Sequence, residues 1–275
     1  MKASRIMFAT EGRPLFIDMV HSNNAARIRL WIRLKGLTDK IDTKLITYAD
    51  LQSPDYARIN PFKKVPGMLL EDGKTHLFES KVIMSYLEDR FGKEGPSLVL
   101  DTPEARARVN LLCSIHDLYI ASPNCTQPNF AHTQGAMYLP PYKTKHSSQE
   151  RAMDRSTRAA KLAEIWKQLS WLESEIDATP YMAGERLSHA DLTWFPTCVF
   201  MEYMLPRVFS WPQIFHEKEH FPKLCRWFEG LRNEQPLFAA VHADIWNFWV
   251  MKDGDGQFDS IKDEIKDPNF KWVYP

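Results

Sequence analysis

The stretch from Asn60 to Ser80 constrains the fold of this chain more than any other segment. An apolar run follows Val65-Pro66, then the turn Glu71-Asp72-Gly73-Lys74, then a second apolar run that ends at Glu79-Ser80. An Asp-Gly pair suits the positive φ angles of a tight turn, so this pattern predicts a hairpin of two strands. Ser80 then precedes apolar residues at helical spacing, which predicts a helix directly after the hairpin.

The residues at the two ends of this hairpin carry polar groups suited to a peptide ligand. Pro66 makes the Val65–Pro66 bond a candidate for the cis form, since the trans preference of an X-Pro bond is only about 0.5–1 kcal/mol. A cis bond here is expected to turn the main chain of Val65 outward, so that its N–H and C=O can pair with an extended peptide. The hydroxyl of Ser80 and the first N–H groups of its helix can hold a carboxylate. The segment therefore predicts a socket for a small acidic peptide.

The overall composition excludes several classes of protein. The 275 residues include 35 Lys and Arg and 35 Asp and Glu, and this balance argues against nucleic-acid binding. No apolar run approaches the ~20 residues of a membrane span, so we expect no membrane span. The cysteines lie far apart without metal-ligand spacing, which predicts reduced thiols, no metal site and a cytoplasmic location; they are Cys113, Cys125, Cys198 and Cys225.

The first third of the chain alternates between strand and helix patterns. The predicted order is β-α-β-α-β-β-α, with strands at 15–20 and 44–47, a helix at 25–35, a short link at 53–59, the hairpin, and the helix from Ser80. We expect the helix at 25–35 to end at Gly36. Its apolar face is Ile28, Trp31 and Ile32, and the pattern places Arg27, Arg29, Arg33 and Lys35 on the opposite, polar face.

The rest of the chain predicts helices alone. We expect a domain over 1–92 with an extension at 1–14, a linker at 93–100, a helical domain over 101–249 and a tail at 250–275. Helices are expected from Asp101-Thr102-Pro103 and at about 148–176, separated by a long loop at 121–147. Ser188 and Asp191 have the spacing of a capping box, which predicts a further helix start.

This arrangement resembles the soluble glutathione transferases of the serine type, nearest to the phi, theta and zeta classes, from about residue 15 to about residue 249. The resemblance implies an α/β plus all-α fold, in which an N-terminal thioredoxin-like βαβαββα domain is followed by an all-helical C-terminal domain. It also implies that glutathione is the co-substrate, that its thiolate is transferred to a small hydrophobic electrophile, and that the protein is a homodimer.

Ser22 has the place of the serine that binds the glutathione sulfur in this family, after the first strand and before the first helix. A hydroxyl donor and a helix N-terminus both favour a thiolate. Serine before a helix is also a common N-cap, and that reading stays open. His21 and Asn23 are alternatives for contacting the sulfur. Because no cysteine precedes Cys113, a mixed-disulfide mechanism at this position is not expected.

The resemblance also implies the remaining site residues. Val65 and Pro66 correspond to the cysteinyl contact, Glu79 and Ser80 to the γ-glutamyl contact, and Lys64, Gln52 and Ser53 to the glycyl end. Glu79 could instead cap its helix, and the neighbouring Lys63 could be a surface charge. For the electrophile pocket we expect His116, Tyr119, Phe130 and Tyr138.

A second hypothesis is a non-catalytic ligand-binding or assembly protein of the same fold, suggested by the long loop at 121–147 and the tail. Isomerase, ether-cleaving or peroxidase activity would use the same thiolate and is not separated from transfer by the sequence.

Overall fold

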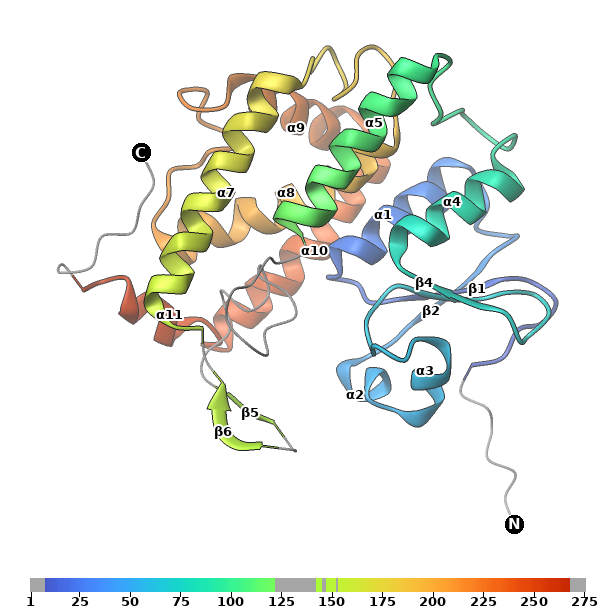
Figure 1. The fold of residues 1–275 in the computed structure, drawn as a ribbon, viewed down its shortest axis with the longest axis horizontal. Helices are drawn as coiled ribbons and strands as arrows, with labels where there is room; N and C mark the ends of the chain where they lie inside the picture. The colour runs from blue at the N-terminus through green and yellow to red at the C-terminus, as the bar shows by residue number, and fades with distance from the viewer. Residues whose placement is uncertain (1–7, 122–141, 145–146, 152, 268–275) are drawn as a thin grey trace. The chain divides into compact units, whose positions relative to one another are not determined.

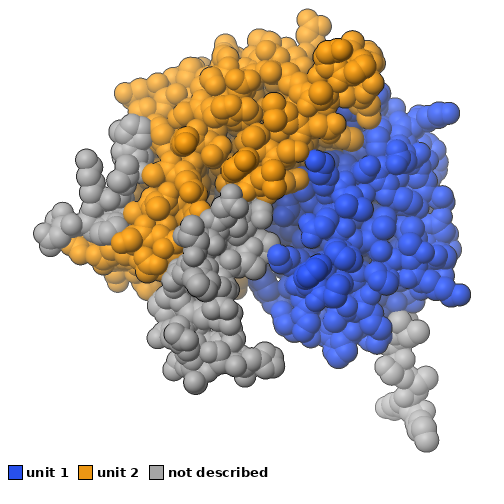
Figure 2. All heavy atoms as spheres, viewed as in Figure 1, with its two compact units in different colours: residues 1–98, 236–245 blue, residues 99–235, 246–275 orange. Residues whose placement is uncertain are grey.

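The computed structural model describes residues 8–121, 142–144, 147–151 and 153–267. It contains two compact units, of which unit 1 comprises residues 1–98 and 236–245, and unit 2 comprises residues 99–235 and 246–275 (Figure 2). The first part of unit 1 contains β1 (Leu15–Asp18), α1 (Asn23–Leu34), β2 (Asp42–Leu45), α2 (Tyr48–Leu51), α3 (Pro54–Ile59), β3 (Gly67–Leu69), β4 (His76–Phe78) and α4 (Ser80–Phe91) (Figure 1).

The strands of unit 1 form one mixed sheet in the order β2-β1-β3-β4. Strand β1 is parallel to β2 and antiparallel to β3, and β3 is antiparallel to β4. The predicted βαβαββα order and the hairpin are therefore confirmed. Gly73, in the turn of the hairpin, has φ +66°. That conformation favours glycine because it has no Cβ.

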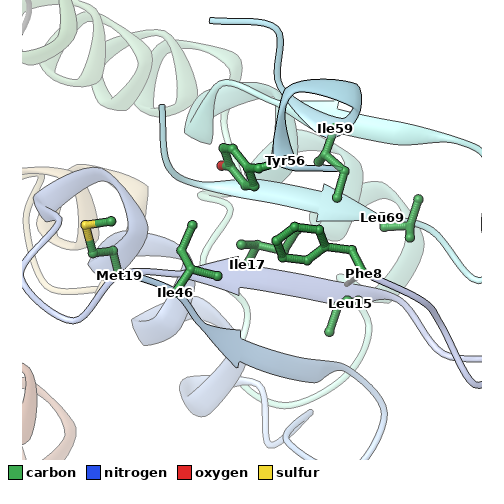
Figure 3. Packing of buried hydrophobic residues seen from close by; sticks show 8 residues of the cluster. All are labelled: Phe8, Leu15, Ile17, Met19, Ile46, Tyr56, Ile59 and Leu69. Atoms are coloured by element: carbon green, nitrogen blue, oxygen red, sulfur yellow. The ribbon is translucent and has the colours of Figure 1, made fainter. Parts of the chain in front are cut away.

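A cluster of buried apolar side chains holds α3 against this sheet. Figure 3 shows Tyr56 and Ile59 of α3 above Ile17 of β1, with Phe8 beside them. The rings of Phe8 and Tyr56 meet edge to face, with centroids 5.7 Å apart. Burial of each such side chain contributes about 1.5–3 kcal/mol to stability, so the cluster fixes the segment that leads into β3.

Helix α1 begins and ends at the expected kinds of residue. Ser22 is its N-cap, and its hydroxyl accepts a hydrogen bond from Ala25 N–H at 3.2 Å. At the other end Gly36 has φ +69°, and Leu37 N–H reaches the carbonyl of Ile32 at 3.0 Å. This is a Schellman ending, so the predicted stop at Gly36 is confirmed.

The expectation of a polar face on α1 is wrong for three of its four cations. Arg27, Arg29 and Lys35 are only 3%, 5% and 3% exposed. Arg29 forms a bidentate pair with Asp18 of β1, at 2.7 and 3.0 Å, and also bonds to Asp244 at 3.0 Å. These cations are buried because unit 1 covers α1 on several sides and supplies polar partners for them there. The spacing of residues along α1 cannot indicate such partners, since they come from other segments of the chain.

The described residues of unit 2 form helices and one small sheet. Its elements are α5 (Pro103–Ile115), the π-helical turn η1 (His116–Ile120), β5 (Tyr142–Thr144), β6 (Ser147–Arg151), α7 (Arg155–Glu175), α8 (His189–Phe209), α9 (Pro222–Glu234) and α11 (Asp259–Glu264), while α10 (Pro236–Gly254) is divided between the units (Figure 1). The predicted capping box is confirmed: the Asp191 carboxylate accepts from Ser188 N–H at 2.9 Å. Among the described residues, no helix has the length and apolar character needed to cross a membrane.

Two boundaries in unit 2 differ from the prediction. The helix expected from about 148 begins at Arg155, because Asp154 caps it, while residues 147–151 form β6 in an antiparallel pair with β5. The tail expected from 250 continues α10 to Gly254 and then forms α11. Phe258 and Ile261 are 0% and 1% exposed, so this segment is anchored by apolar burial that short sequence patterns do not show.

Candidate functional site

The main chain at Val65 is available to a ligand. The Val65–Pro66 peptide is cis, as the sequence suggested. Val65 lies just before β3 and packs partly against the apolar cluster. Its N–H and C=O make no hydrogen bond within the described part of the chain. An unpaired donor and acceptor next to a strand can bind an extended peptide as an added strand.

The segment before Val65 is held in place by two hydrogen bonds to one carbonyl. The hydroxyl of Tyr56 donates to the carbonyl of Lys64 at 2.5 Å, and Asn60 Nδ2 donates to the same oxygen at 2.8 Å. Lys63 has φ +53° and is exposed, so its side chain extends from a backbone conformation that L-residues seldom adopt. Lys64 is half-buried beside it. The main chain that presents Val65 is therefore rigid.

Glu79 and Ser80 mark the start of α4. Glu79 is exposed, has φ +67° and makes no capping hydrogen bond with its side chain. Glu79 is therefore the N-cap of α4 by position, but its side chain does not cap the helix. Such a φ costs about 1–3 kcal/mol in a non-glycine residue and is found preferentially at ligand sites. The N-terminus of α4 is consequently left without a side-chain cap.

Ser80 is bonded to a residue that the sequence did not place in the site. The guanidinium of Arg27 donates a hydrogen bond to Ser80 Oγ, and both residues are 3% exposed. Because the spacing of α1 placed Arg27 on a polar face, only the packing of α1 against α4 reveals this contact. A buried cation and a helix N-terminus at one place both favour an anionic ligand.

The register of the sheet brings the two halves of the predicted socket together. Gly67 of β3 pairs with Phe78 of β4 in an antiparallel arrangement. Val65 lies two residues before Gly67 and Ser80 lies two residues after Phe78, so both are close in sequence to the same end of this strand pair. The predicted cysteinyl and γ-glutamyl contacts therefore lie on neighbouring segments of unit 1.

Ser22 caps α1, and its hydroxyl still has a proton to donate. It accepts from Ala25 N–H, which uses an oxygen lone pair, and within the described residues it donates to nothing. The alternative of an N-cap is thus seen in the structure and does not exclude a second hydrogen bond. His21 is 8% exposed and is hydrogen-bonded through Nε2 to Tyr48 Oη at 2.7 Å. The side-chain oxygen of Asn23 is buried and has no partner in the described residues.

Gln52 and Ser53 lie where α2 passes into α3. Gln52 ends α2 and is exposed. Ser53 is the N-cap of α3, and its hydroxyl accepts from Tyr56 N–H at 3.1 Å. Both are on unit 1, as the prediction of the glycyl contact requires.

The residues expected in an electrophile pocket differ in their exposure to solvent, and two of them lie outside the described residues. His116 is 1% exposed, with Nε2 at 2.8 Å from Thr197 Oγ1 and Nδ1 at 2.9 Å from Asp117 Oδ1. That is the arrangement of a core side chain of unit 2. Tyr119, in η1, is 46% exposed. Phe130 and Tyr138 lie outside the described residues.

Comparison with known proteins identifies the family. Residues 21–90 match the glutathione S-transferase N-terminal domain, and residues 155–230 match its C-terminal domain. Glutathione S-transferase F10 of Arabidopsis thaliana is 30% identical over 62% of this chain and 72% of its own length. Glutathione S-transferase hmp2 of Hypomyces subiculosus is 27% identical over 71% of this chain and 83% of its own.

A solved structure agrees at the level of the fold. Glutathione transferase F7 of Populus trichocarpa superposes with a TM-score of 0.61 at 19% identity, covering 84% of this chain and 99% of that one. The two domain matches, the 30% identical relative and the thioredoxin-like sheet followed by helices agree with one another. The chain therefore belongs to the glutathione S-transferase family of enzymes.

Proposed function

We propose that this protein binds glutathione on unit 1, stabilises its thiolate at Ser22 and transfers the sulfur to a small hydrophobic electrophile. The observation that carries the proposal is the unpaired main chain of Val65, close in sequence to the end of the β3–β4 pair that Ser80 also follows. When an extended γ-glutamyl peptide lies alongside Val65, the α-carboxylate of its γ-glutamyl residue reaches the N-terminus of α4. Glu79, exposed there, is suited to the ammonium group of the same γ-glutamyl residue.

Transfer of the glutathione sulfur requires that Ser22 stabilise the thiolate relative to the neutral thiol. A free thiol has a pKa of about 8.5, and each unit by which the pKa is lowered requires about 1.4 kcal/mol of preference for the thiolate. Ser22 can donate its hydroxyl proton to the sulfur while it continues to cap α1. The N-terminus of α1 adds a positive partial charge at the same place. These two effects act on the anion and not on the neutral thiol.

The glycyl end of the ligand completes the proposed site. Lys64 supplies a cation next to Val65, and Gln52 and Ser53 supply polar side chains where α2 ends. We propose that the electrophile is bound by residues of the helical unit, with the exposed Tyr119 as the first candidate and His116 and Tyr138 as further ones. His116 supports such a pocket from within the core, because its ring is packed against Trp194.

Association and location are part of the same proposal. Phe62 and Val82 of unit 1 are 65% and 50% exposed, and the rings of Phe62 and Phe78 meet at 5.8 Å. Contiguous exposed apolar surface is typical of association sites, and the contact between Phe62 and Phe78 therefore supports a homodimer. Native protein that sediments as a dimer would support it, and a native monomer would contradict it. A Phe62→Ala variant that sediments as a monomer would place Phe62 in the interface, whereas a dimeric Phe62→Ala would exclude that role. Among the described residues no disulfide joins Cys113, Cys198 or Cys225, which supports a cytoplasmic location.

The test compares native protein with Ser22→Ala in glutathione binding by calorimetry and in thiol conjugation to an aryl halide. We expect kcat/KM of Ser22→Ala to fall about 10²-fold or more, because a hydrogen bond to the developing charge is lost. Thr102→Ala is the matched control, since Thr102 caps α5 in the same way, accepting from Ala105 N–H at 3.1 Å. Thr102→Ala should lose the side-chain cap of α5 and keep the activity of native protein. Equal rates for native protein and Ser22→Ala would remove Ser22 from the mechanism, and no glutathione binding at millimolar concentration would contradict the function itself.

A further inference from the structure

Helix α2 is attached to unit 1 by few contacts. None of its residues is buried. Its capping box, in which Thr47 and Asp50 bond to each other, stabilises the helix internally but does not hold it to its neighbours. Leu51 packs partly against the apolar cluster. The position of α2 therefore depends on what else contacts it.

One such contact joins Tyr48, the first residue of α2, to His21. His21 Nε2 and Tyr48 Oη are 2.7 Å apart, and the two rings lie with centroids 5.4 Å apart at 42°. His21 is 8% exposed, so little water competes for this hydrogen bond. Tyr48 is 58% exposed as a whole, but desolvation raises the pKa of its hydroxyl. The hydroxyl is thus the covered end of the side chain.

Both residues lie next to groups that the proposed function assigns to glutathione. His21 directly precedes Ser22, whose N–H is held by the carbonyl of Met19 at 2.8 Å. Tyr48 begins the helix that ends at Gln52. The hydrogen bond therefore connects the turn that carries the sulfur-binding serine to the segment at the glycyl end. Along the chain these two parts are separated by the whole of α1 and β2.

We propose that His21 and Tyr48 are a pair of positioning residues that hold α2 at the glycyl end of the site and so favour glutathione over thiols that lack glycine. The inference rests on the proposed function, which places Gln52 and Ser53 at the glycyl carboxylate. Val65 and Ser80, which meet the rest of the ligand, lie outside α2: Val65 directly precedes β3, and Ser80 begins α4. The pair therefore acts on one end of the tripeptide only.

The test uses two thiols, glutathione and γ-glutamylcysteine, which lacks the glycyl residue. Tyr48→Phe keeps the exposed ring and removes the hydroxyl. We expect its Kd for glutathione to rise about two- to tenfold, the range for loss of one net hydrogen bond, while its Kd for γ-glutamylcysteine stays as in native protein. In steady-state assays KM for glutathione should rise in parallel, and kcat at saturating glutathione should be retained.

Tyr86→Phe is the matched control. Tyr86 lies on α4, and its hydroxyl has no hydrogen-bond partner in the described part of the chain. This variant should bind both thiols as native protein does. A double variant of His21→Ala and Tyr48→Phe should weaken glutathione binding by less than the product of the two single effects, because both changes remove the same contact.

The outcomes separate this inference from the proposed function. If Tyr48→Phe weakens the binding of glutathione and of γ-glutamylcysteine equally, or changes neither affinity, the positioning role is overturned while the proposed function stands. If native protein binds neither thiol, the proposed function fails and the inference fails with it. Hydrogen exchange gives a readout without ligand: amides of residues 48–53 should exchange faster in Tyr48→Phe than in Tyr86→Phe. Identical exchange in the two variants would show that the contact does not hold α2.

Discussion

The guanidinium of Arg27 in α1 donates a hydrogen bond to the hydroxyl of Ser80, the first residue of α4. Both side chains are almost fully buried. The bond therefore joins the two helices and directs a permanent positive charge toward the N-terminus of α4, which is itself electropositive. Two positive groups at one buried place favour the carboxylate that the proposed function assigns to this position.

Arg27→Met tests the contribution of this bond, since it keeps the apolar stem and removes the guanidinium. We expect the free energy of unfolding to fall by about 1.5–3 kcal/mol, because a buried hydroxyl loses a charged donor. Urea denaturation measures the change. Arg33→Met on the same helix is the control, because Arg33 is half-buried and its side chain makes no hydrogen bond among the described residues. Similar losses in both variants would show that the Arg27–Ser80 bond contributes little.

Asp18→Asn should be far more damaging than Asp42→Asn. Asp18 is 1% exposed and makes a bidentate pair with Arg29, while Asp42 pairs with Arg13 at the surface. We expect a loss of about 3 kcal/mol for Asp18→Asn, since the buried guanidinium of Arg29 then keeps, within the described part of the chain, only Asp244 as an anionic partner. The surface pair should lose about 1 kcal/mol or less. Thermal unfolding of the two variants side by side checks the ranking, and equal melting temperatures would contradict it.

Gly67→Ala should disturb the chain that presents Val65. A Cβ at Gly67 would lie 3.1 Å from Tyr56 Oη and 3.2 Å from Ile59 Cγ2. The tyrosine hydroxyl is already bonded to the carbonyl of Lys64, so a shift there is transmitted to the binding segment. We expect about 1–3 kcal/mol of destabilisation, as in other overpacked sites. Weaker glutathione binding, measured by calorimetry, should accompany it.

Gly230→Ala is the corresponding control for that experiment. Gly230 lies in α9, and a Cβ there meets nothing within 4 Å. Because alanine is a better helix former, the variant should gain up to about 1 kcal/mol in stability. A Gly67→Ala variant that is as stable as Gly230→Ala would show that Tyr56 and Ile59 move aside at no cost.

The hairpin turn contains a carboxyl group with an unusual titration. The pKa of Asp72 is lowered from 3.8 to about 2, first by the hydroxyl of Thr75 and then by the main-chain N–H groups of Lys74 and Thr75. Because the folded-state pKa lies below the unfolded one, Asp72 stabilises the fold above pH 3.8, and this contribution is lost as pH falls through about 2.

Thr75→Val should raise the pKa of Asp72 toward its usual value, as followed by carboxyl-carbon chemical shifts. Thr157→Val is the reciprocal control, since Thr157 lowers the pKa of Asp154 in the same way. That variant should raise the pKa of Asp154 and leave Asp72 unchanged. If Asp72 titrates identically in native protein and Thr75→Val, the hydroxyl is not the cause of the shift.

The order of elements in unit 1 could be predicted from the sequence because it depends on local patterns. The hairpin turn at Asp72-Gly73, the stop at Gly36 and the capping box at Ser188 and Asp191 each act through residues close together in the chain. The placement of Val65 near Ser80 also follows locally, since a short hairpin fixes the register between its strands. These predictions needed no knowledge of long-range packing.

The environment of α1 could not be predicted in the same way. Arg27, Arg29 and Lys35 look like surface cations in the sequence, and their partners are distant in the chain: Ser80, Asp18 and Glu88. The contact between His21 and Tyr48 is hidden for the same reason. Helical periodicity gives the direction of a side chain around its own axis, but not which other segments lie on that side.

The sequence by itself determined where the strands and helices of unit 1 follow one another, where α1 stops at Gly36 and where the hairpin turns at Asp72-Gly73. Only the tertiary structure decided that the cations of α1 are buried, that Arg27 bonds to Ser80 and that His21 holds α2 through Tyr48. The physical reason is that capping and turn formation are satisfied within a few residues, whereas a buried polar group needs a partner from another part of the chain.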